Sequence, residues 1–178
     1  MELNILLFIQ ENVRNIILNY FFAGITFSGN NGYIWIIISL GLLLNKKTRF
    51  IGVLSFIVLL EVLLINNLII KNCFERLRPF ITYAQIELLI DAPTGYSFTS
   101  GHSCSSFASA IIFIKYLPKK YGIAAVIYAT LVAFSRLYFG VHYPTDVIAG
   151  MMLGILFALI TSGVYEKYVK NKIVSKWL

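Results

Sequence analysis

The sequence predicts an all-α protein, a polytopic bundle of membrane helices that forms a single domain over residues 1–178. Hydrophobic residues make up 58% of the chain and charged residues 13%, which is about half the charged share of a soluble domain. A soluble core of this size cannot hide so much apolar surface, whereas a bilayer accommodates it. Several segments also reach the length of about 20 apolar residues that a helix needs to cross the hydrocarbon.

Six segments are expected to be transmembrane helices: residues 3–28, 30–45, 50–70, 101–118, 120–138 and 146–164. The first is ambiguous because polar and charged residues interrupt it between positions 10 and 14, and a helix that spans is favoured over one that lies in the interface. Residues 80–99 are the one long connection, and their composition predicts a loop at the membrane surface. Small residues at the start of the 101–118 segment predict close helix contacts in lipid.

The basic residues predict which helix ends face the cytoplasm. A net charge of +7 would raise nucleic acid as a partner of a soluble protein, but in a membrane protein cations mark cytoplasmic ends. With six spans, ten cations fall on one side: Lys46, Lys47, Arg49, Lys115, Lys119, Lys120, Lys167, Lys170, Lys172 and Lys176. Four fall on the other: Lys71, Arg76, Arg78 and Arg136. We therefore expect the first side to be cytoplasmic, with the bilayer and not nucleic acid as partner.

Three isolated features carry smaller expectations. Cys73 and Cys104 have no metal-ligand spacing, and unpaired thiols are favoured over a disulfide. The N-terminus opens with Glu2 rather than with basic residues, so a cleaved signal peptide is not expected. Glu61 lies within an apolar segment, and we expect it to face the bundle interior as a hydrogen-bonded structural group.

The four cations on the minority side belong to three polar segments of the sequence. The segments are Lys71 to Arg78-Pro79, then Thr99-Ser100-Gly101-His102, and then Ser135-Arg136 with His142 and Asp146. Each segment alone has an ordinary interpretation, as interface anchors, a helix cap or a structural histidine. However, both histidines of the chain lie in these segments, on one side of the membrane and beside three cations. This combination favours a shared site.

The residue types in these segments indicate phosphate chemistry. Arginine offers a planar fork to two phosphate oxygens and lysine a compact charge. A helix N-terminus adds free N–H groups and a positive dipole end, and Gly101 leaves room for an oxygen to approach. Two histidines supply a nucleophile and a proton donor. No carboxylate cluster suited to Mg²⁺ or Zn²⁺ occurs in the sequence, so neither a metal nor a cofactor is expected.

The spacing of His142 and Asp146 indicates which histidine attacks. Pro144 suits the first turn of a helix, which places Asp146 about one turn beyond His142. A carboxylate that holds one ring N–H leaves the other ring nitrogen bare and steadies the cation formed on attack.

These three segments resemble the signature of the type 2 phosphatidic acid phosphatase family, which shares its helical core with vanadium haloperoxidases. The resemblance covers residues 71–146 and implies six transmembrane helices, with a site at the extracytoplasmic face of the cell membrane. It implies that His142 forms a phosphohistidine, that Asp146 orients it and that His102 protonates the leaving oxygen. The phosphate-binding residues that it implies are Lys71, Arg78, Ser100, Gly101 and Arg136. The chain departs from the pattern at Thr99, where the family commonly has proline, and this puts the stiffness of that turn in question.

We therefore expect a metal-independent lipid phosphatase, with undecaprenyl pyrophosphate as the favoured substrate. Phosphatidylglycerol phosphate and phosphatidic acid are the alternative substrates, because nothing in residues 71–146 recognises the lipid tail. A phosphotransferase, a phosphate-binding transporter and a vanadate haloperoxidase are the alternative functions. The transporter is disfavoured because binding alone requires neither a nucleophile nor an acid. The sequence makes no prediction of oligomeric state.

Overall fold

The computed structural model describes residues 1–170, and every regular element in that range is helical. The longer helices are α1 (Glu2–Asn12), α2 (Ile16–Gly29), α3 (Tyr33–Leu44), α4 (Arg49–Glu61), α7 (Gly101–Tyr116), α8 (Lys119–Tyr138) and α9 (Pro144–Val164). The shorter ones are η1 (Asn30–Gly32), η2 (Val62–Ile70), α5 (Lys71–Phe74), α6 (Pro79–Thr82) and η3 (Tyr165–Lys170). The expected all-α class is confirmed.

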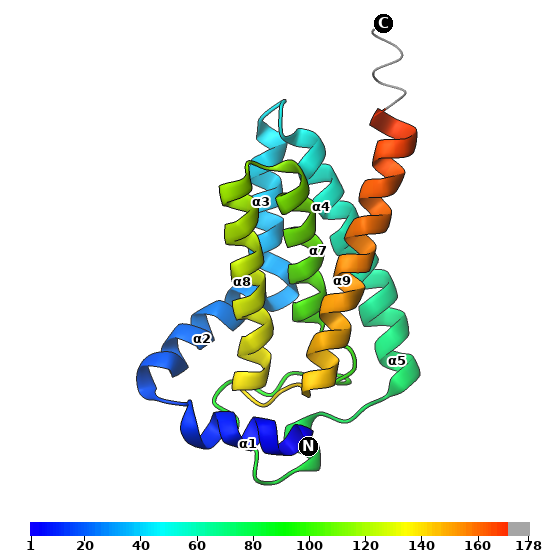
Figure 1. Cartoon of the computed structure of the whole chain (residues 1–178). Helices are drawn as coiled ribbons and strands as arrows, with labels where there is room; N and C mark the ends of the chain where they lie inside the picture. Colours follow the sequence, from blue (N-terminus) through cyan, green and yellow to red (C-terminus); the bar gives the residue numbers. More distant parts are fainter. Residues whose placement is uncertain (171–178) are drawn as a thin grey trace, which may run out of the picture.

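Helices α3, α4, α7, α8 and α9 run side by side and form the body of the molecule (Figure 1). Helix α7 is the central element and contacts α4, α8 and α9, and its residues 103–110 are all buried. Two glycines of α9 let the α7 and α9 backbones meet. A Cβ on Gly150 would lie 2.5 Å from the carbonyl oxygen of Ser100, and one on Gly154 2.2 Å from that of Cys104. Small residues therefore hold the start of α7 next to the start of α9, as expected for helices packed in lipid.

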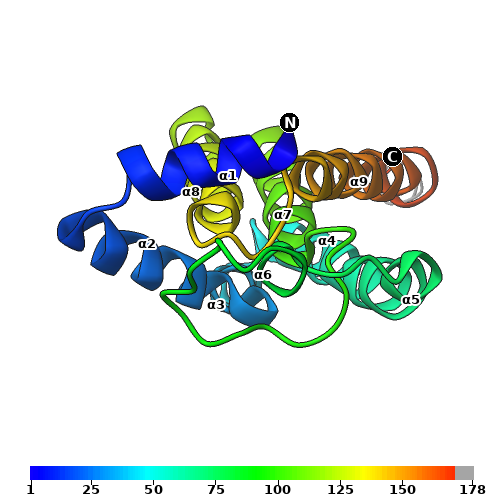
Figure 2. The ribbon, with the colours of Figure 1, turned by 90° about the horizontal axis from the view of Figure 1, so that it is seen from below.

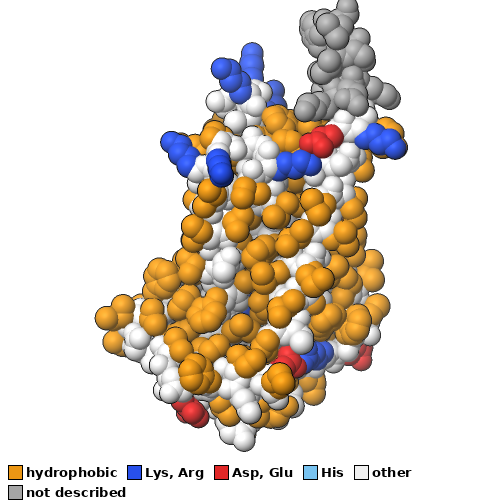
Figure 3. All heavy atoms as spheres, in the orientation of Figure 1, with side chains coloured by type: hydrophobic (Ala, Val, Ile, Leu, Met, Phe, Trp, Pro, Cys, Tyr) orange, Lys and Arg blue, Asp and Glu red, His pale blue; other side chains and the backbone are white. Residues whose placement is uncertain are grey.

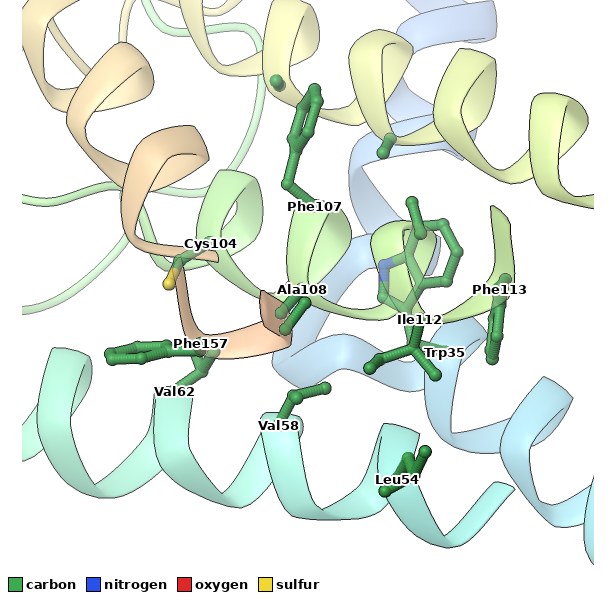
Figure 4. Close-up of a cluster of buried hydrophobic side chains, with 14 of the residues drawn as sticks. Trp35, Leu54, Val58, Val62, Cys104, Phe107, Ala108, Ile112, Phe113 and Phe157 are labelled. Atoms are coloured by element: carbon green, nitrogen blue, oxygen red, sulfur yellow. The ribbon is translucent and has the colours of Figure 1, made fainter. Parts of the chain in front are cut away.

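The main apolar core lies between α3, α4, α7 and α9 (Figure 4). Trp35 and Phe113 are each 1% exposed, and Val58 and Ile112 have no exposed surface. The one polar atom of the indole is satisfied, because Nε1 of Trp35 donates to the hydroxyl of Ser106 at 2.9 Å. In lipid, close packing of this kind stabilises a bundle through dispersion rather than through transfer out of water.

The number of candidate membrane spans in residues 1–170 is four, fewer than the six expected. Four helical stretches of residues 1–170 are long and apolar enough to cross a bilayer: Ile16–Leu44, Arg49–Thr82, Lys119–Tyr138 and Pro144–Val169. Helix α7 has 16 residues, fewer than the roughly 20 of a typical span, and its position at the centre of the bundle removes most of it from lipid. The expected polytopic bundle of membrane helices is confirmed.

Residues 3–28 form two helices rather than the single helix that their apolarity predicts. Asn15 starts α2, where its side chain accepts a hydrogen bond from the N–H of Leu18 at 3.0 Å. The preceding Arg14 donates to the carbonyl oxygens of Tyr138 at 2.9 Å and Glu87 at 2.8 Å. These contacts draw the chain toward the end of α8, so α1 lies across the end of the bundle (Figures 1 and 2).

The connection between α6 and α7 runs across the same end as α1, as expected for a surface loop (Figure 2). Gln10 of α1 holds it at two points, donating to the carbonyl oxygen of Gln85 and accepting from the N–H of Glu87, both at 3.0 Å. Helix α1 and this loop therefore cover one end of the bundle, where α8 ends and α7 and α9 begin.

The opposite end of the bundle carries exposed cations, as Figure 3 shows at the top of the view. Those exposed on the α3–α4 and α7–α8 turns are Lys46, Lys47, Arg49, Lys119 and Lys120. These two turns thus share one end of the molecule, as the assignment of cations to sides requires, while Lys172 and Lys176 lie outside the described residues. Cys73 is exposed and Cys104 buried, and the expectation of unpaired thiols is confirmed.

Glu61 lies at the contact between α4 and α9, half-buried, where its Oε1 accepts from the hydroxyl of Thr161 at 2.8 Å. Its Oε2 is buried without a hydrogen-bond partner in residues 1–170. An amide keeps the acceptor and needs no charge, so Glu61→Gln is expected to lower the melting temperature in detergent by less than about 3 °C. It should also leave catalytic turnover largely intact. Glu61→Ala, which removes the acceptor of Thr161, is the matched variant and should melt lower. Loss of turnover in a folded Glu61→Gln protein would contradict the structural interpretation.

Candidate active site

The three polar segments predicted from the sequence come together at the end of the bundle where α1 lies. They surround a cavity of about 900 Å³. Six of the predicted site residues line this cavity: Lys71, Arg78, Gly101, His102, Arg136 and His142. The other two, Ser100 and Asp146, have no exposed surface.

Arg78 is held rigidly in the wall of the cavity. Its guanidinium donates to three backbone carbonyl oxygens, those of Val141 at 3.0 Å, Gly95 at 2.9 Å and Thr94 at 3.0 Å. The side chain is therefore anchored by the α6–α7 loop and by the turn before α9. Its Nη1 also lies 3.2 Å from Nε2 of His142, so a fixed cation stands next to a candidate nucleophile.

Within residues 1–170, the cations of the cavity form no ion pair with a carboxylate. Arg136 is 2% exposed; its Nη1 donates to the hydroxyl of Thr26, and its Nε has no hydrogen-bond partner within residues 1–170. Of the ion pairs in that range, none involves Arg136, Arg78 or Lys71. Positive charge buried without a counter-ion is costly, and an anion that enters the cavity relieves this cost.

His142 and Asp146 lie beside one another, and a serine contacts both. Nδ1 of His142 is 3.6 Å from Oδ2 of Asp146, which is longer than a hydrogen bond. The hydroxyl of Ser97 donates to that Oδ2 at 2.5 Å and lies 3.4 Å from Nδ1. The N–H of Tyr143 donates to the same Oδ2 at 2.9 Å. Nδ1 thus faces the carboxylate, and Nε2 is the ring nitrogen next to the cations of the cavity.

Burial and nearby cations hold the pKa of His142 well below its usual range. Burial has the largest effect because it penalises the charged ring, and repulsion from Arg78, Arg136 and Lys71 adds to it. The ring is therefore neutral near physiological pH, and one of its nitrogens keeps a lone pair. A neutral imidazole is the form that a nucleophilic role requires.

His102 occupies the first turn of α7 and lines the same cavity. Its Nε2 is 3.0 Å from the side-chain oxygen of Asn30, which belongs to η1 at the bend between α2 and α3. Gly29 leaves space for this ring, since a Cβ there would lie 3.0 Å from its Cδ2. The polar break in the sequence before residue 33 therefore fixes the orientation of a candidate acid.

Ser100 and Gly101 have local roles that the sequence left open. The Ser100 hydroxyl accepts from the N–H of Ser103 at 3.3 Å, which is a helix cap, and its own N–H donates to the carbonyl oxygen of Asp146 at 3.0 Å. A Cβ on Gly101 would lie 2.8 Å from the side-chain oxygen of Asn67. In residues 1–170 the missing side chain thus makes room for Asn67, and the role of both residues in phosphate binding stays a prediction.

Thr99, the departure from the family pattern, takes part in a polar chain across two segments. Its hydroxyl donates to the side-chain oxygen of Asn66, whose amide donates to that of Asn67 at 2.9 Å. Proline at position 99 would have no hydroxyl for this contact. The two asparagines stand out in an otherwise apolar stretch, which is a signal that could have marked them from the sequence.

Comparison with known proteins identifies relatives over most of the chain. A family model described as the PAP2 superfamily matches residues 50–170, which include every predicted site residue. Undecaprenyl-diphosphatase from Sulfolobus acidocaldarius is 38% identical over 122 residues, which cover 68% of this chain and 59% of that relative. Phosphatidylglycerophosphatase B from Bacillus subtilis is 36% identical over 169 residues, which cover 87% of this chain and 79% of that relative.

The fold agrees with a solved structure of the same kind. The crystal structure of a transmembrane PAP2 type phosphatidylglycerolphosphate phosphatase from Bacillus subtilis superimposes with a TM-score of 0.76 at 32% identity. The superposition covers 94% of this chain and 85% of the other. Sequence and fold thus agree, and this multi-pass membrane protein belongs to the PAP2 superfamily.

Proposed function

We propose that this chain is a lipid phosphatase that works through a phosphohistidine on His142. The observation that carries the proposal is a cavity lined by two histidines and three cations, and none of these cations forms an ion pair with a carboxylate of the described part of the chain. Lys71, Arg78 and Arg136 would hold the phosphate, with Gly101 and the capped N-terminus of α7 beside them. This arrangement suits a phosphoryl group, whose transfer depends on positioning and on neutralising charge.

The reaction has two steps, each balanced within the site. Nε2 of His142 attacks phosphorus, the bond from phosphorus to the leaving oxygen breaks, and His102 gives that oxygen a proton. Water then attacks the phosphohistidine, giving its proton to His102, and the P–N bond breaks to release phosphate. Asp146 supports the ring of His142 while it carries positive charge.

The cavity also has an apolar side, which supports a lipid-linked substrate. Besides the polar residues, it is lined by Phe27, Ile36, Phe56, Leu60 and Leu63. These residues come from α2, α3, α4 and η2. A head group at the cations can therefore continue into hydrocarbon.

Undecaprenyl pyrophosphate is the substrate that we propose, since one relative is named for its hydrolysis. Phosphatidylglycerol phosphate is the runner-up, favoured by the name of a second relative, and phosphatidic acid the third candidate. Phosphate release from these three lipids by the purified protein tests the choice, with the highest kcat/KM expected for the pyrophosphate. Binding of all three without phosphate release would favour a transporter, and appearance of a phosphorylated acceptor lipid would favour a phosphotransferase.

Turnover is expected to be independent of metal ions, because the sequence has no carboxylate cluster at the motifs. Phosphatase activity should persist in EDTA. Vanadate should inhibit the enzyme, because it resembles the transition-state phosphorus and can bind to the same cations of the cavity. Phosphate release with and without each reagent checks this. Activity lost in EDTA and restored by Mg²⁺ would contradict it.

We further propose that the site faces the outside of the plasma membrane, because the exposed cations gather at the other end. In a background without Cys73 and Cys104, single cysteines at Asp91 and Lys47 test this in intact cells. Both residues are exposed, the first in the α6–α7 loop and the second in the α3–α4 turn. An impermeant thiol reagent should label position 91 and spare position 47, which should react once the cells are permeabilised. The reverse pattern would place the site in the cytoplasm.

A further inference from the structure

Arg76 belongs to no predicted site, yet it forms an ion pair with the carboxylate behind His142. Its Nη1 donates to Oδ1 of Asp146 at 2.6 Å and to the hydroxyl of Thr145 at 2.7 Å. Its guanidinium carbon lies 3.8 Å from the centre of the Tyr143 ring. Asp146 has no exposed surface, and Arg76 places a positive charge directly against its buried side chain.

The backbone of Arg76 supports the same carboxylate by a second route. Its carbonyl oxygen accepts from the N–H of Ser97 at 2.7 Å. The hydroxyl of Ser97 in turn donates to Oδ2 of Asp146. Both oxygens of Asp146 are thus held through Arg76, one by its side chain and one through Ser97.

Arg76 is itself anchored by the N-terminal helix. Oε2 of Glu2 accepts from Nη2 of Arg76 at 2.6 Å. The other oxygen of Glu2 accepts from the N–H of Thr145 at 3.1 Å and from its hydroxyl at 2.7 Å. An acidic side chain at the first turn of α9 also suits the positive end of that helix. Glu2 therefore joins α1 both to Arg76 and to the helix that carries Asp146.

We infer that Arg76 is a positioning residue for the reaction, and that Glu2 of α1 holds it in place. The chain of contacts runs from Glu2 to Arg76, then to Asp146 and His142, and it links α1 to the nucleophile. Held on both oxygens, the carboxyl group of Asp146 stays fixed beside His142 while that ring gains positive charge. The role is to speed formation of the phosphohistidine, not to bind substrate, since neither Arg76 nor Glu2 lines the cavity.

This inference rests on the proposed phosphatase function, and its test is the rate constant for phosphohistidine formation in a single turnover. That constant does not depend on what fraction of the protein is active. Arg76→Gln should lower it about tenfold to a hundredfold, the range found when a residue that orients a catalytic ligand is removed. KM should change by less than about twofold, because the cations of the cavity are untouched. Arg76→Lys should recover part of the loss, since it restores the charge opposite Asp146.

Glu2→Gln provides a milder variant that does not unpair the buried carboxylate. It should lower the same rate constant by up to about fivefold, as expected for a partly exposed ion pair. In the Arg76→Gln background it should have no further effect, because Glu2 acts through Arg76. Glu11→Gln, an exposed residue of the same helix, is the matched control and should leave the rate constant unchanged.

Several results would overturn the inference. These are an unchanged or higher rate constant in Arg76→Gln, additive losses in the double variant, or a loss that appears in KM alone. If Arg76→Gln does not fold, an unchanged rate constant for phosphohistidine formation in Glu2→Gln would also overturn the inference. A wild-type protein that forms no phosphoenzyme and releases no phosphate would instead refute the proposed function, so the two failures are distinguishable.

Discussion

His142→Ala is expected to abolish phosphate release, with kcat falling roughly 10⁴- to 10⁶-fold as in other enzymes that lose a nucleophile. The reason is the position of the ring. Nδ1 faces Asp146 and Ser97, while Nε2 lies 3.2 Å from Nη1 of Arg78 at the cavity. Among the described residues that line the cavity, His142 is the histidine whose ring has a carboxylate behind it.

Covalent labelling separates loss of the nucleophile from loss of the fold. Wild-type protein incubated with substrate labelled on the transferred phosphorus and denatured at alkaline pH, where a P–N bond survives, should retain the label. His142→Ala should retain none, although its melting temperature and its binding of vanadate show that the cavity is formed. Label of wild-type amount in His142→Ala would mean that another residue attacks.

The residues of the site could be predicted where their chemical type alone indicates phosphate chemistry. Two histidines, three cations and a glycine at a helix start limit the possibilities strongly, and the structure places six of the eight predicted residues around one cavity. Close packing of α7 on α9 brings together the segments that hold His102 and His142. The small residues that allow this packing can be recognised in the sequence.

The partners that orient these residues could not be predicted, because they come from distant segments with no pattern of their own. Glu2 meets Arg76 across 74 positions, and Thr26 meets Arg136 across 110. Ser97 is an ordinary serine in a loop until the fold places it against Asp146. Such contacts depend on where a loop crosses the end of the bundle, which local propensity does not determine.

The N-terminal stretch shows the same limit at the level of helices. Apolarity alone favours one long helix over residues 3–28, and a membrane span was the expected interpretation. The break depends on Arg14, whose charge is satisfied by carbonyl oxygens of the α6–α7 loop and of the end of α8. These hydrogen bonds of Arg14 form only in the folded protein. They place α1 across the end of the bundle, where Glu2 contacts Arg76.

His102→Ala is expected to show a loss that depends on the leaving group. General acid catalysis contributes about 10²- to 10⁴-fold, and its contribution is greatest when the departing oxygen is strongly basic. The leaving group of phosphatidic acid is an alcohol, diacylglycerol. Turnover of this lipid should therefore fall by about that factor. Diacylglycerol pyrophosphate has the same tails, but its leaving group is a phosphate ester that needs little protonation. The rate constant for phosphohistidine formation from this lipid should therefore fall by less than about tenfold.

The ratio of the two losses, measured on one preparation by single-turnover kinetics, is independent of how much of the protein is folded. Asn30→Ala is the matched positioning variant, because it removes the side-chain oxygen 3.0 Å from Nε2 of His102 and leaves the ring. It should show the same preference between the two lipids with smaller losses. In His102→Ala the phosphohistidine formed from the pyrophosphate should also accumulate, since the group that accepts a proton from the attacking water is missing. Equal losses for both lipids, with no accumulation, would show that His102 shapes the cavity and does not move the proton.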